Sequence, residues 1–181
     1  MTLPQVESWV SLQYPDANLS ELRAGEETWA DPYIVFELLL GRLEGVKQKA
    51  EYHPEGDAQY HSLQAFDLAR EQFPHDEEFL QAALLHDVGK GVDPGRHIEA
   101  ALEALRGLIP PRTAFLIEFH SAARHLREGT LTGRLRQHLL DSEWHEDLMA
   151  LLEIDDAARR PGVPAPTVAE AIGYLRSLNE W

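Results

Sequence analysis

Two histidines and two aspartates are the residues of this chain best suited to chemistry. They are His61, the adjacent pair His86-Asp87, and Asp155. Neutral imidazole and carboxylate are ligands for borderline or hard divalent metal ions. A metal ion that keeps open coordination positions can activate water for attack on a phosphate. The residue types therefore predict a divalent metal site that acts on phosphoesters.

A second His-Asp pair in the chain serves as an internal comparison. His75-Asp76 follows Pro74 and precedes Glu77-Glu78. An aspartate in that place is typical of a helix N-cap, and acids in the first turn are stabilised by the helix dipole. We predict a structural role for this pair, so the dipeptide alone does not identify a site.

His86-Asp87 stands in a different setting, because it closes an apolar helix. A buried carboxylate without a partner is costly, and a cation is the simplest partner. Gly89-Lys90-Gly91 follows directly. Glycines let the backbone approach a ligand closely, and Lys90 is placed to meet a phosphate as a point charge. The alternative is a core histidine bonded to a helix end, with Lys90 in solvent.

Composition indicates an ordinary globular protein. The chain has 181 residues, of which 44% are hydrophobic and 26% charged. We divide it into an extension over residues 1–31, packed on a domain over residues 32–181. The absence of cysteine excludes disulfides, thiolate zinc sites and a cysteine nucleophile. A formal net charge of -15 disfavours binding to nucleic acid, although a metal ion can still attract a small anion.

The start of the chain does not look like a targeting segment. Residues 1–14 carry Glu7 and no lysine or arginine, unlike a signal peptide. No stretch approaches the roughly 18 apolar residues that a membrane span requires. We therefore expect a cytoplasmic protein that has no membrane contact.

Helical periodicity recurs along the chain, and no alternating strand pattern is present. Two short helices are expected near residues 4–12 and 18–25. Longer ones are expected over about 32–49, 57–73, 76–86, 97–108, 142–159 and 167–178, with another that begins at Pro110-Pro111 and carries His120 and His125. Gly129 and Gly133 flank a short link. The pattern predicts an all-α helical bundle.

Asp155 and Asp156 compete for the role of the last acidic ligand. Neighbouring residues on a helix point about 100° apart. Asp155 lies four residues after Leu151 and seven after Leu148, so it shares their inward face. We favour Asp155 on this ground and expect Asp156 to be a surface acid paired with Arg159.

Three sequence blocks carry a resemblance to a known family. They are His53-Pro54-Glu55-Gly56-Asp57, then His61-Ser62-Leu63, and Leu84 to Gly91, which reads LLHDVGKG. Together they resemble the HD-domain superfamily of metal-dependent phosphohydrolases. Within it, they are most similar to the HD domain appended to bacterial CCA-adding tRNA nucleotidyltransferases. Residues 50–125 carry the match, and Asp155-Asp156-Ala157-Ala158-Arg159 extends it with a variant of the family's D-x-x-G-R ending.

The resemblance has limits. The first 45 residues match nothing that we can place. A nucleotidyltransferase domain begins its motif with Gly-Ser, and this dipeptide does not occur in the chain. The resemblance therefore implies an HD-domain-like bundle that lacks the nucleotidyltransferase domain.

The resemblance also implies a ligand set and a cofactor. The metal ligands would be His61, His86, Asp87 and Asp155, and the cofactor one or two divalent ions of manganese, nickel, cobalt, magnesium, zinc or iron. Asp87, as a ligand or a bridge between two ions, and Lys90 would be the catalytic residues.

Further histidines are candidates for a second ion or for substrate. His97 stands where many family members have an additional histidine, with a polar helix start as the alternative. His120 has apolar neighbours and is the better candidate of the two histidines in its helix. His125 lies among Arg124 and Arg127 and could instead meet a substrate phosphate. We expect His53, His138 and His145 to be exposed or to cap helices.

Three functions remain open at this level. The first is hydrolysis of a small phosphoester, such as a nucleotide or a 2′,3′-cyclic nucleotide. The second is a di-iron oxygenase, which needs both His97 and His120 as ligands. The third is a non-catalytic module that binds a nucleotide or a partner protein. The expected partner is a small phosphorylated substrate, and the sequence leaves a homo-oligomer open.

Overall fold

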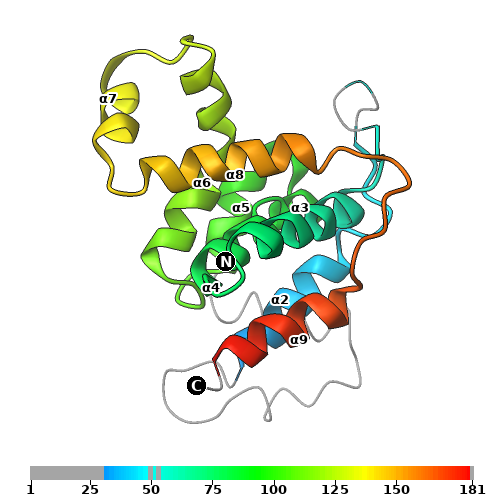
Figure 1. Cartoon of the computed structure of the whole chain (residues 1–181). Helices are drawn as coiled ribbons and strands as arrows, with labels where there is room; N and C mark the ends of the chain where they lie inside the picture. The colour runs from blue at the N-terminus through cyan, green and yellow to red at the C-terminus, as the bar shows by residue number, and fades with distance from the viewer. Residues whose placement is uncertain (1–30, 49–50, 52–53, 180–181) are drawn as a thin grey trace.

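The computed structural model describes residues 31–48, 51 and 54–179, and α-helices dominate this part of the chain (Figure 1). The helices, labelled as in Figure 1, are α2 (Pro32–Gly41), α3 (Ala58–Gln72), α4 (Glu77–Leu85), α5 (His97–Ala104), α6 (Pro111–Arg127), α7 (Gly133–Asp141), α8 (His145–Ala157) and α9 (Val168–Leu178). Two short 3-10 turns, η1 (Val88–Gly91) and η2 (Pro94–Arg96), join α4 to α5. Within the described ranges no strand forms, and the β-type pairing is an isolated bridge between Lys47 and Asp57. The predicted all-α bundle is confirmed.

Polar caps fix where several helices begin. Asp57 accepts hydrogen bonds from the backbone N–H groups of Gln59 and Tyr60, and Asp76 accepts one from Phe79. Thr167 starts α9 with a capping box, in which Glu170 bonds back to the Thr167 N–H. The predicted structural role of Asp76 is confirmed. The caps of α3 and α4 set the starting points of the helices that position His61, His86 and Asp87.

Two expected elements differ from the structure. The helix predicted over about 32–49 ends at Gly41, and Gly45 then adopts a φ of 74°, a left-handed conformation that glycine tolerates and that turns the chain. Residues 46–48 pair with residues 56–58 instead of continuing the helix. The short link expected between Gly129 and Gly133 is followed by α7, which was not predicted.

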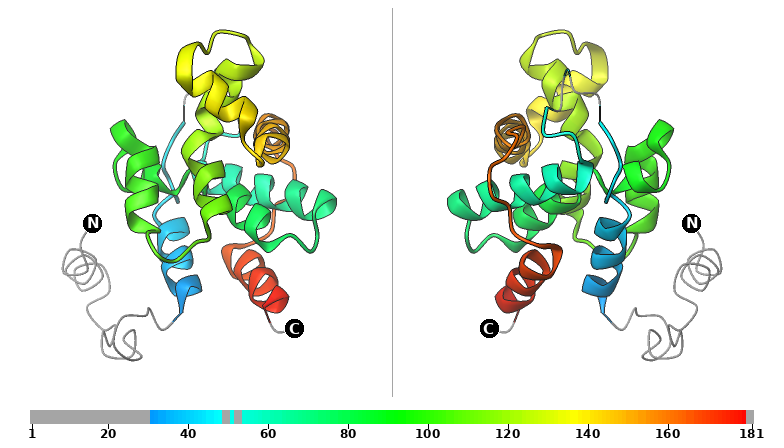
Figure 2. Two further views of the ribbon diagram at one scale, coloured as in Figure 1. Left: turned by 90° about the vertical axis from the view of Figure 1, so that its left-hand side faces the viewer. Right: turned by 90° about the vertical axis from the view of Figure 1, so that its right-hand side faces the viewer.

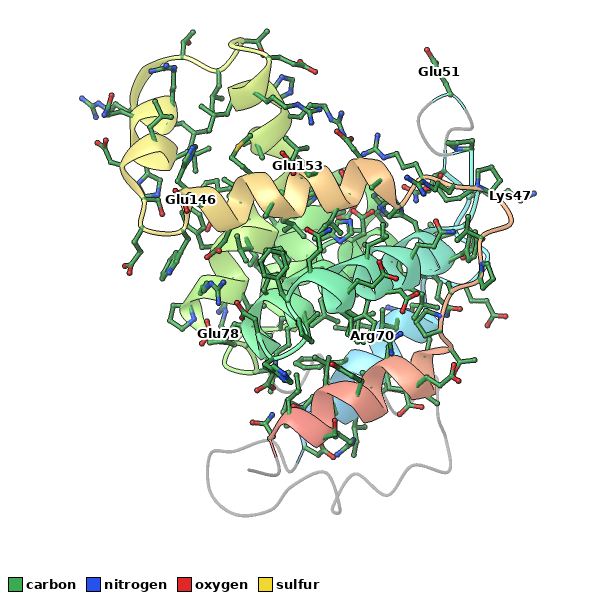
Figure 3. The ribbon with its side chains drawn as sticks, viewed as in Figure 1. Lys47, Glu51, Arg70, Glu78, Glu146 and Glu153 are labelled. Atoms are coloured by element: carbon green, nitrogen blue, oxygen red, sulfur yellow. The ribbon has the colours of Figure 1, made fainter. Side chains whose placement is uncertain are left out.

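The paired segments form a hairpin, of which the structure describes residues 46–48, 51 and 54–57. The Ala58 N–H donates to the Val46 carbonyl at 3.1 Å, and the Gln48 N–H donates to the Gly56 carbonyl at 3.0 Å. Figure 3 shows Lys47 at the base of this hairpin and Glu51 at its outer end. The hairpin thus brings residues 48 and 55, seven positions apart in sequence, to the same side of the bundle.

Helix α4 lies at the centre of the fold. Every residue from Phe79 to Leu85 is buried, and α3, α6 and α8 pack around it. Helices α2 and α9 lie side by side at one end, where the Tyr33 hydroxyl donates to Glu77 Oε1 at 2.8 Å (Figure 1). Helix α7 projects at the opposite end in each view (Figure 2). The central helix therefore ends, at residue 85, deep inside the bundle.

The predicted N-terminal extension stays untested. The extension predicted over residues 1–31, with its two short helices, lies outside the described residues apart from Asp31, which caps α2. None of the described helices combines the length and apolar character needed to cross a membrane.

Candidate metal centre

Five helices bring the predicted ligands together. His61 lies just past the first turn of α3, His86 and Asp87 follow the end of α4, His120 lies in α6, and Asp155 lies in the last turn of α8. All five side chains are buried. His97, the first residue of α5, is half-buried beside them. Residues as far apart as 61 and 155 in the sequence thus converge, as the resemblance implies.

His61 is held between two carboxylates. Its Nδ1 lies 3.0 Å from Glu55 Oε1, and its Nε2 lies 2.9 Å from Asp155 Oδ1. Burial disfavours the charged imidazolium, yet the hydrogen bonds to Asp155 and Glu55 raise the pKa of His61 to about 9. When Nδ1–H donates to Glu55, Nε2 is the nitrogen directed toward Asp155.

His86 presents an available lone pair at the centre of the group. Its Nδ1 donates to the Ala83 carbonyl at 2.9 Å, so Nε2 carries the lone pair. Within the described part of the chain, this buried Nε2 has no hydrogen-bond partner. It lies 3.5 Å from Asp87 Oδ2 and 4.0 Å from Asp155 Oδ1. Burial lowers the pKa of His86, which favours the neutral form that binds metal.

Asp87 connects two groups of ligand atoms. Its Oδ2 accepts from Lys90 Nζ at 2.6 Å, and its Oδ1 lies 3.8 Å from His120 Nε2. Burial alone would raise the pKa of Asp87, but His86 and Lys90 hold it well below its usual range. Lys90 Nζ also donates to Gln48 Oε1 at 2.6 Å. The Asp87 carboxylate is therefore ionised and fixed in place.

A second set of ligand atoms lies on the other side of Asp87. One group contains atoms of His61, His86 and Asp87, and the other contains atoms of Asp87, His97 and His120; the atoms of each group lie within 4.8 Å of one another. His120 Nδ1 donates to the Ile117 carbonyl at 2.7 Å, which leaves its Nε2 as the acceptor. Burial lowers the pKa of His120 to about 4, so this imidazole is neutral.

The spacing of these atoms fits a divalent metal ion. In an octahedral site with metal–ligand bonds of 2.0–2.1 Å, neighbouring ligand atoms lie roughly 3 Å apart and opposite ones roughly 4 Å apart. The distances between His61, His86 and Asp155 atoms are 2.9 Å and 4.0 Å. The donor set of imidazoles and carboxylates, with the His86 lone pair unpartnered at its centre, therefore suits a hard or borderline cation.

The other acidic and histidine candidates lie outside this group. Asp156 turns away and accepts from Arg124 and Arg127 at 2.5 Å and 2.7 Å. His125 is exposed and bonds to Thr130. His75 is exposed, His138 packs against the rings of Phe115 and Phe119, and His145 Nδ1 meets the Leu139 carbonyl at 3.1 Å, whereas His53 lies outside the described residues.

Two neighbours of the centre were not identified from the sequence. Glu55 and Gln48 reach it from opposite sides of the hairpin, to His61 and Lys90. Glu55 belongs to one of the quoted sequence blocks, but the resemblance implies no ligand role for it. A search for acids near the start of the His61 helix could have found it, whereas Gln48 carries no comparable signal.

Gly89 and Gly91, which follow Asp87, allow neighbouring chain segments to pack closely. A Cβ on Gly89 would lie 1.8 Å from the His97 carbonyl oxygen, and one on Gly91 would lie 2.9 Å from Arg42 Cβ. We expected these glycines to let the chain approach a ligand. Instead, they let η1 contact the start of α5 and the turn after α2.

Replacement of Gly89 with alanine should destabilise the protein strongly. The new methyl group would overlap backbone atoms of His97, so η1 or α5 must shift, and such overpacking costs about 2–3 kcal/mol or more. Urea unfolding of Gly89→Ala measures this loss. Gly173→Ala in α9 is the control, because a Cβ added there would meet no atom within 4 Å, and it should gain up to about 1 kcal/mol. Equal stability of Gly89→Ala and the parent protein would contradict the observed packing.

Comparison with known proteins gives partial matches. The Multifunctional CCA protein of Stenotrophomonas maltophilia (strain K279a) is 37% identical over 128 residues, which are 67% of this chain and 30% of the relative. The protein of the same name from Xylella fastidiosa (strain M23) is 33% identical over 126 residues, again 67% of this chain and 30% of the relative. That from Paracidovorax citrulli (strain AAC00-1) is 47% identical over 64 residues, 33% of this chain. No family model matches the chain.

The longer of these matches cover about two thirds of this chain and a smaller part of each relative. The chain spans about 30% of the length of the curated relatives with the longest matches. Similarity to CCA proteins is therefore confirmed for about two thirds of the chain. Assignment to an HD domain stays a prediction.

Proposed function

We propose that this chain is a metal-dependent phosphohydrolase with an HD-domain-like bundle. Its substrate would be a small phosphoester, such as a nucleotide or a 2′,3′-cyclic nucleotide. The observation that carries the proposal is the buried His86 Nε2, which lacks a hydrogen-bond partner in the described residues and lies between Asp87 and Asp155. Similarity to proteins named Multifunctional CCA protein supports a nucleotide-related enzyme region.

Six residues would hold metal. His61, His86, Asp87 and Asp155 would bind one ion, and Asp87, His97 and His120 would bind a second. When bound, such an ion polarises a phosphoryl oxygen and lowers the pKa of a coordinated water.

The remaining side chains would position these ligands and the substrate. Glu55 would orient the His61 ring so that Nε2 faces Asp155. Lys90, whose side chain is 20% exposed, is fixed by Asp87 and Gln48 and would offset negative charge on the phosphoryl oxygens. Asp87 would act as the carboxylate shared by both ligand groups.

Hydrolysis of a phosphoester panel with added manganese, cobalt or nickel tests this proposal. The parent protein should turn over at least one nucleotide or cyclic nucleotide, and His86→Ala should lose at least about 100-fold because a central ligand is missing. His75→Ala is the matched control, because His75 also precedes an aspartate but is exposed and belongs to neither ligand group. Turnover that is unchanged in His86→Ala would contradict the assignment.

A di-iron oxygenase is the second candidate, because His97 and His120 both lie beside Asp87. Elemental analysis of the purified protein separates the two. Two irons per chain would favour the oxygenase, whereas manganese, nickel, cobalt, magnesium or zinc would favour the phosphohydrolase. Bound metal without turnover of any phosphoester would favour the non-catalytic module.

A further inference from the structure

Three arginines gather around the neighbouring acids Asp155 and Asp156 beside the candidate centre, and we name them the arginine rim: Arg124, Arg127 and Arg159. Arg124 and Arg127 lie on α6, four and seven residues after His120, and so share one face of that helix. Arg159 follows the end of α8 directly. The three cations are thus placed by the two helices that also carry His120 and Asp155.

Asp156 fixes two of these side chains beside each other. Its Oδ1 accepts from Arg124 Nη2 at 2.5 Å, and its Oδ2 accepts from Arg127 Nη2 at 2.7 Å. Arg159 Nη2 donates to Asp155 Oδ2 at 2.8 Å. A guanidinium held by a carboxylate loses little further entropy when it binds a second anion.

The rim retains hydrogen-bond donors for such an anion. Arginine has five N–H donors, and in the described part of the chain Arg124 and Arg127 bond through Nη2 only. Their side chains are 32% and 42% exposed. Arg159 Nε is buried and has no hydrogen-bond partner among the described residues, which is costly unless a ligand supplies one.

The rim contacts one oxygen of Asp155, and His61 contacts the other. Arg124 Nη2 lies 3.6 Å from Asp155 Oδ2, while the other oxygen of Asp155 lies 2.9 Å from His61 Nε2. The Asp155 carboxylate therefore stands between the rim and the ligand atoms. Lys90 contacts Asp87 instead, and we therefore assign it to the phosphate that meets the ligand cluster.

We propose that the arginine rim binds a second phosphate group of the substrate. This inference rests on the proposed phosphohydrolase function and narrows its substrate to a small nucleotide with two separate phosphate groups. One phosphate would meet the ligand cluster, and the other would accept hydrogen bonds from Arg124, Arg127 and Arg159. The net charge of -15 favours a small nucleotide over a nucleic acid chain.

Matched substrates with and without the second phosphate test the inference. Adenosine 3′-monophosphate is compared with adenosine 3′,5′-bisphosphate, and 2′,3′-cyclic AMP with its 5′-phosphorylated form, all with manganese. The parent protein should show a kcat/KM at least about 10-fold higher for the bisphosphorylated member of a pair. Arg127→Gln should reduce this preference roughly 10-fold, and Arg127→Lys should reduce it less because the charge remains.

Arg136→Gln is the matched control, because it removes the same charge from an exposed position on α7 and should leave the preference intact. Turnover without any preference for the second phosphate would contradict this inference and leave the proposed function standing. Absence of turnover of every phosphoester with every metal would contradict the proposed function itself. A higher kcat/KM for an oligonucleotide with the same 3′-phosphate would overturn the assignment of a small substrate.

Discussion

Asp87→Asn is expected to remove both metal ions at once. Asp87 contributes to both groups of ligand atoms, and a neutral amide is a much weaker ligand than a carboxylate. By contrast, His61→Ala and His120→Ala should each weaken one site, because each residue belongs to one group. Elemental analysis after dialysis against manganese should show near-zero content for Asp87→Asn and an intermediate content for each histidine variant. Phosphoester turnover by Asp87→Asn should fall by at least about 1,000-fold.

Asp76→Asn is the appropriate control for this experiment. It alters the second His-Asp pair, where the side chain caps α4 and bonds to Arg112, and asparagine is also a good N-cap. Its metal content should equal that of the parent protein. Full metal content in Asp87→Asn would show that the carboxylate is not shared, and an unaltered content in His120→Ala would contradict the second ion.

Glu55→Gln should weaken metal binding without removing a ligand. Glu55 accepts from His61 Nδ1 at 3.0 Å, which sets the tautomer and increases the basicity of Nε2. Outer-sphere carboxylates of this kind typically contribute 10–100-fold in metal affinity, so we expect the Kd for manganese to rise roughly 10-fold or more. Isothermal titration with manganese measures this change.

The hairpin offers a matched control for Glu55→Gln. Glu51 lies at its outer end and is exposed, so Glu51→Gln removes the same charge from the same segment (Figure 3). Its affinity should change by less than about twofold, because exposed charges act weakly at a distance in salt. Equal affinity losses in the two variants would mean that Glu55 acts through net charge alone and not by orienting His61.

Local signals explain why most of the bundle could be predicted. Asp57, Asp76 and Thr167 are strong caps, and each starts a helix where the sequence indicates one. Helix α7 has no such signal, because Thr132 makes no side-chain cap bond and Leu139 is its one buried residue. Its position depends on packing against other helices, which periodicity does not reveal.

Part of the candidate site could also be predicted from local sequence signals. A helical-face argument directs Asp155 inward, and the structure buries it against His61 while Asp156 bonds to arginines. Its role as a ligand stays a prediction. The contribution of Glu55 could not be read, because it depends on a hairpin that replaced part of an expected helix.

The contact between Gly89 and His97 has a consequence for how this protein can change. The separation between the end of α4 and the start of α5 is set by main-chain atoms touching each other, and not by the shapes of core side chains. Exchange of leucines and phenylalanines in the surrounding core therefore cannot bring Asp87 closer to His97 than these main-chain atoms allow. Redesign of the interior, whether by drift or by engineering, should leave the geometry of this half of the cluster intact.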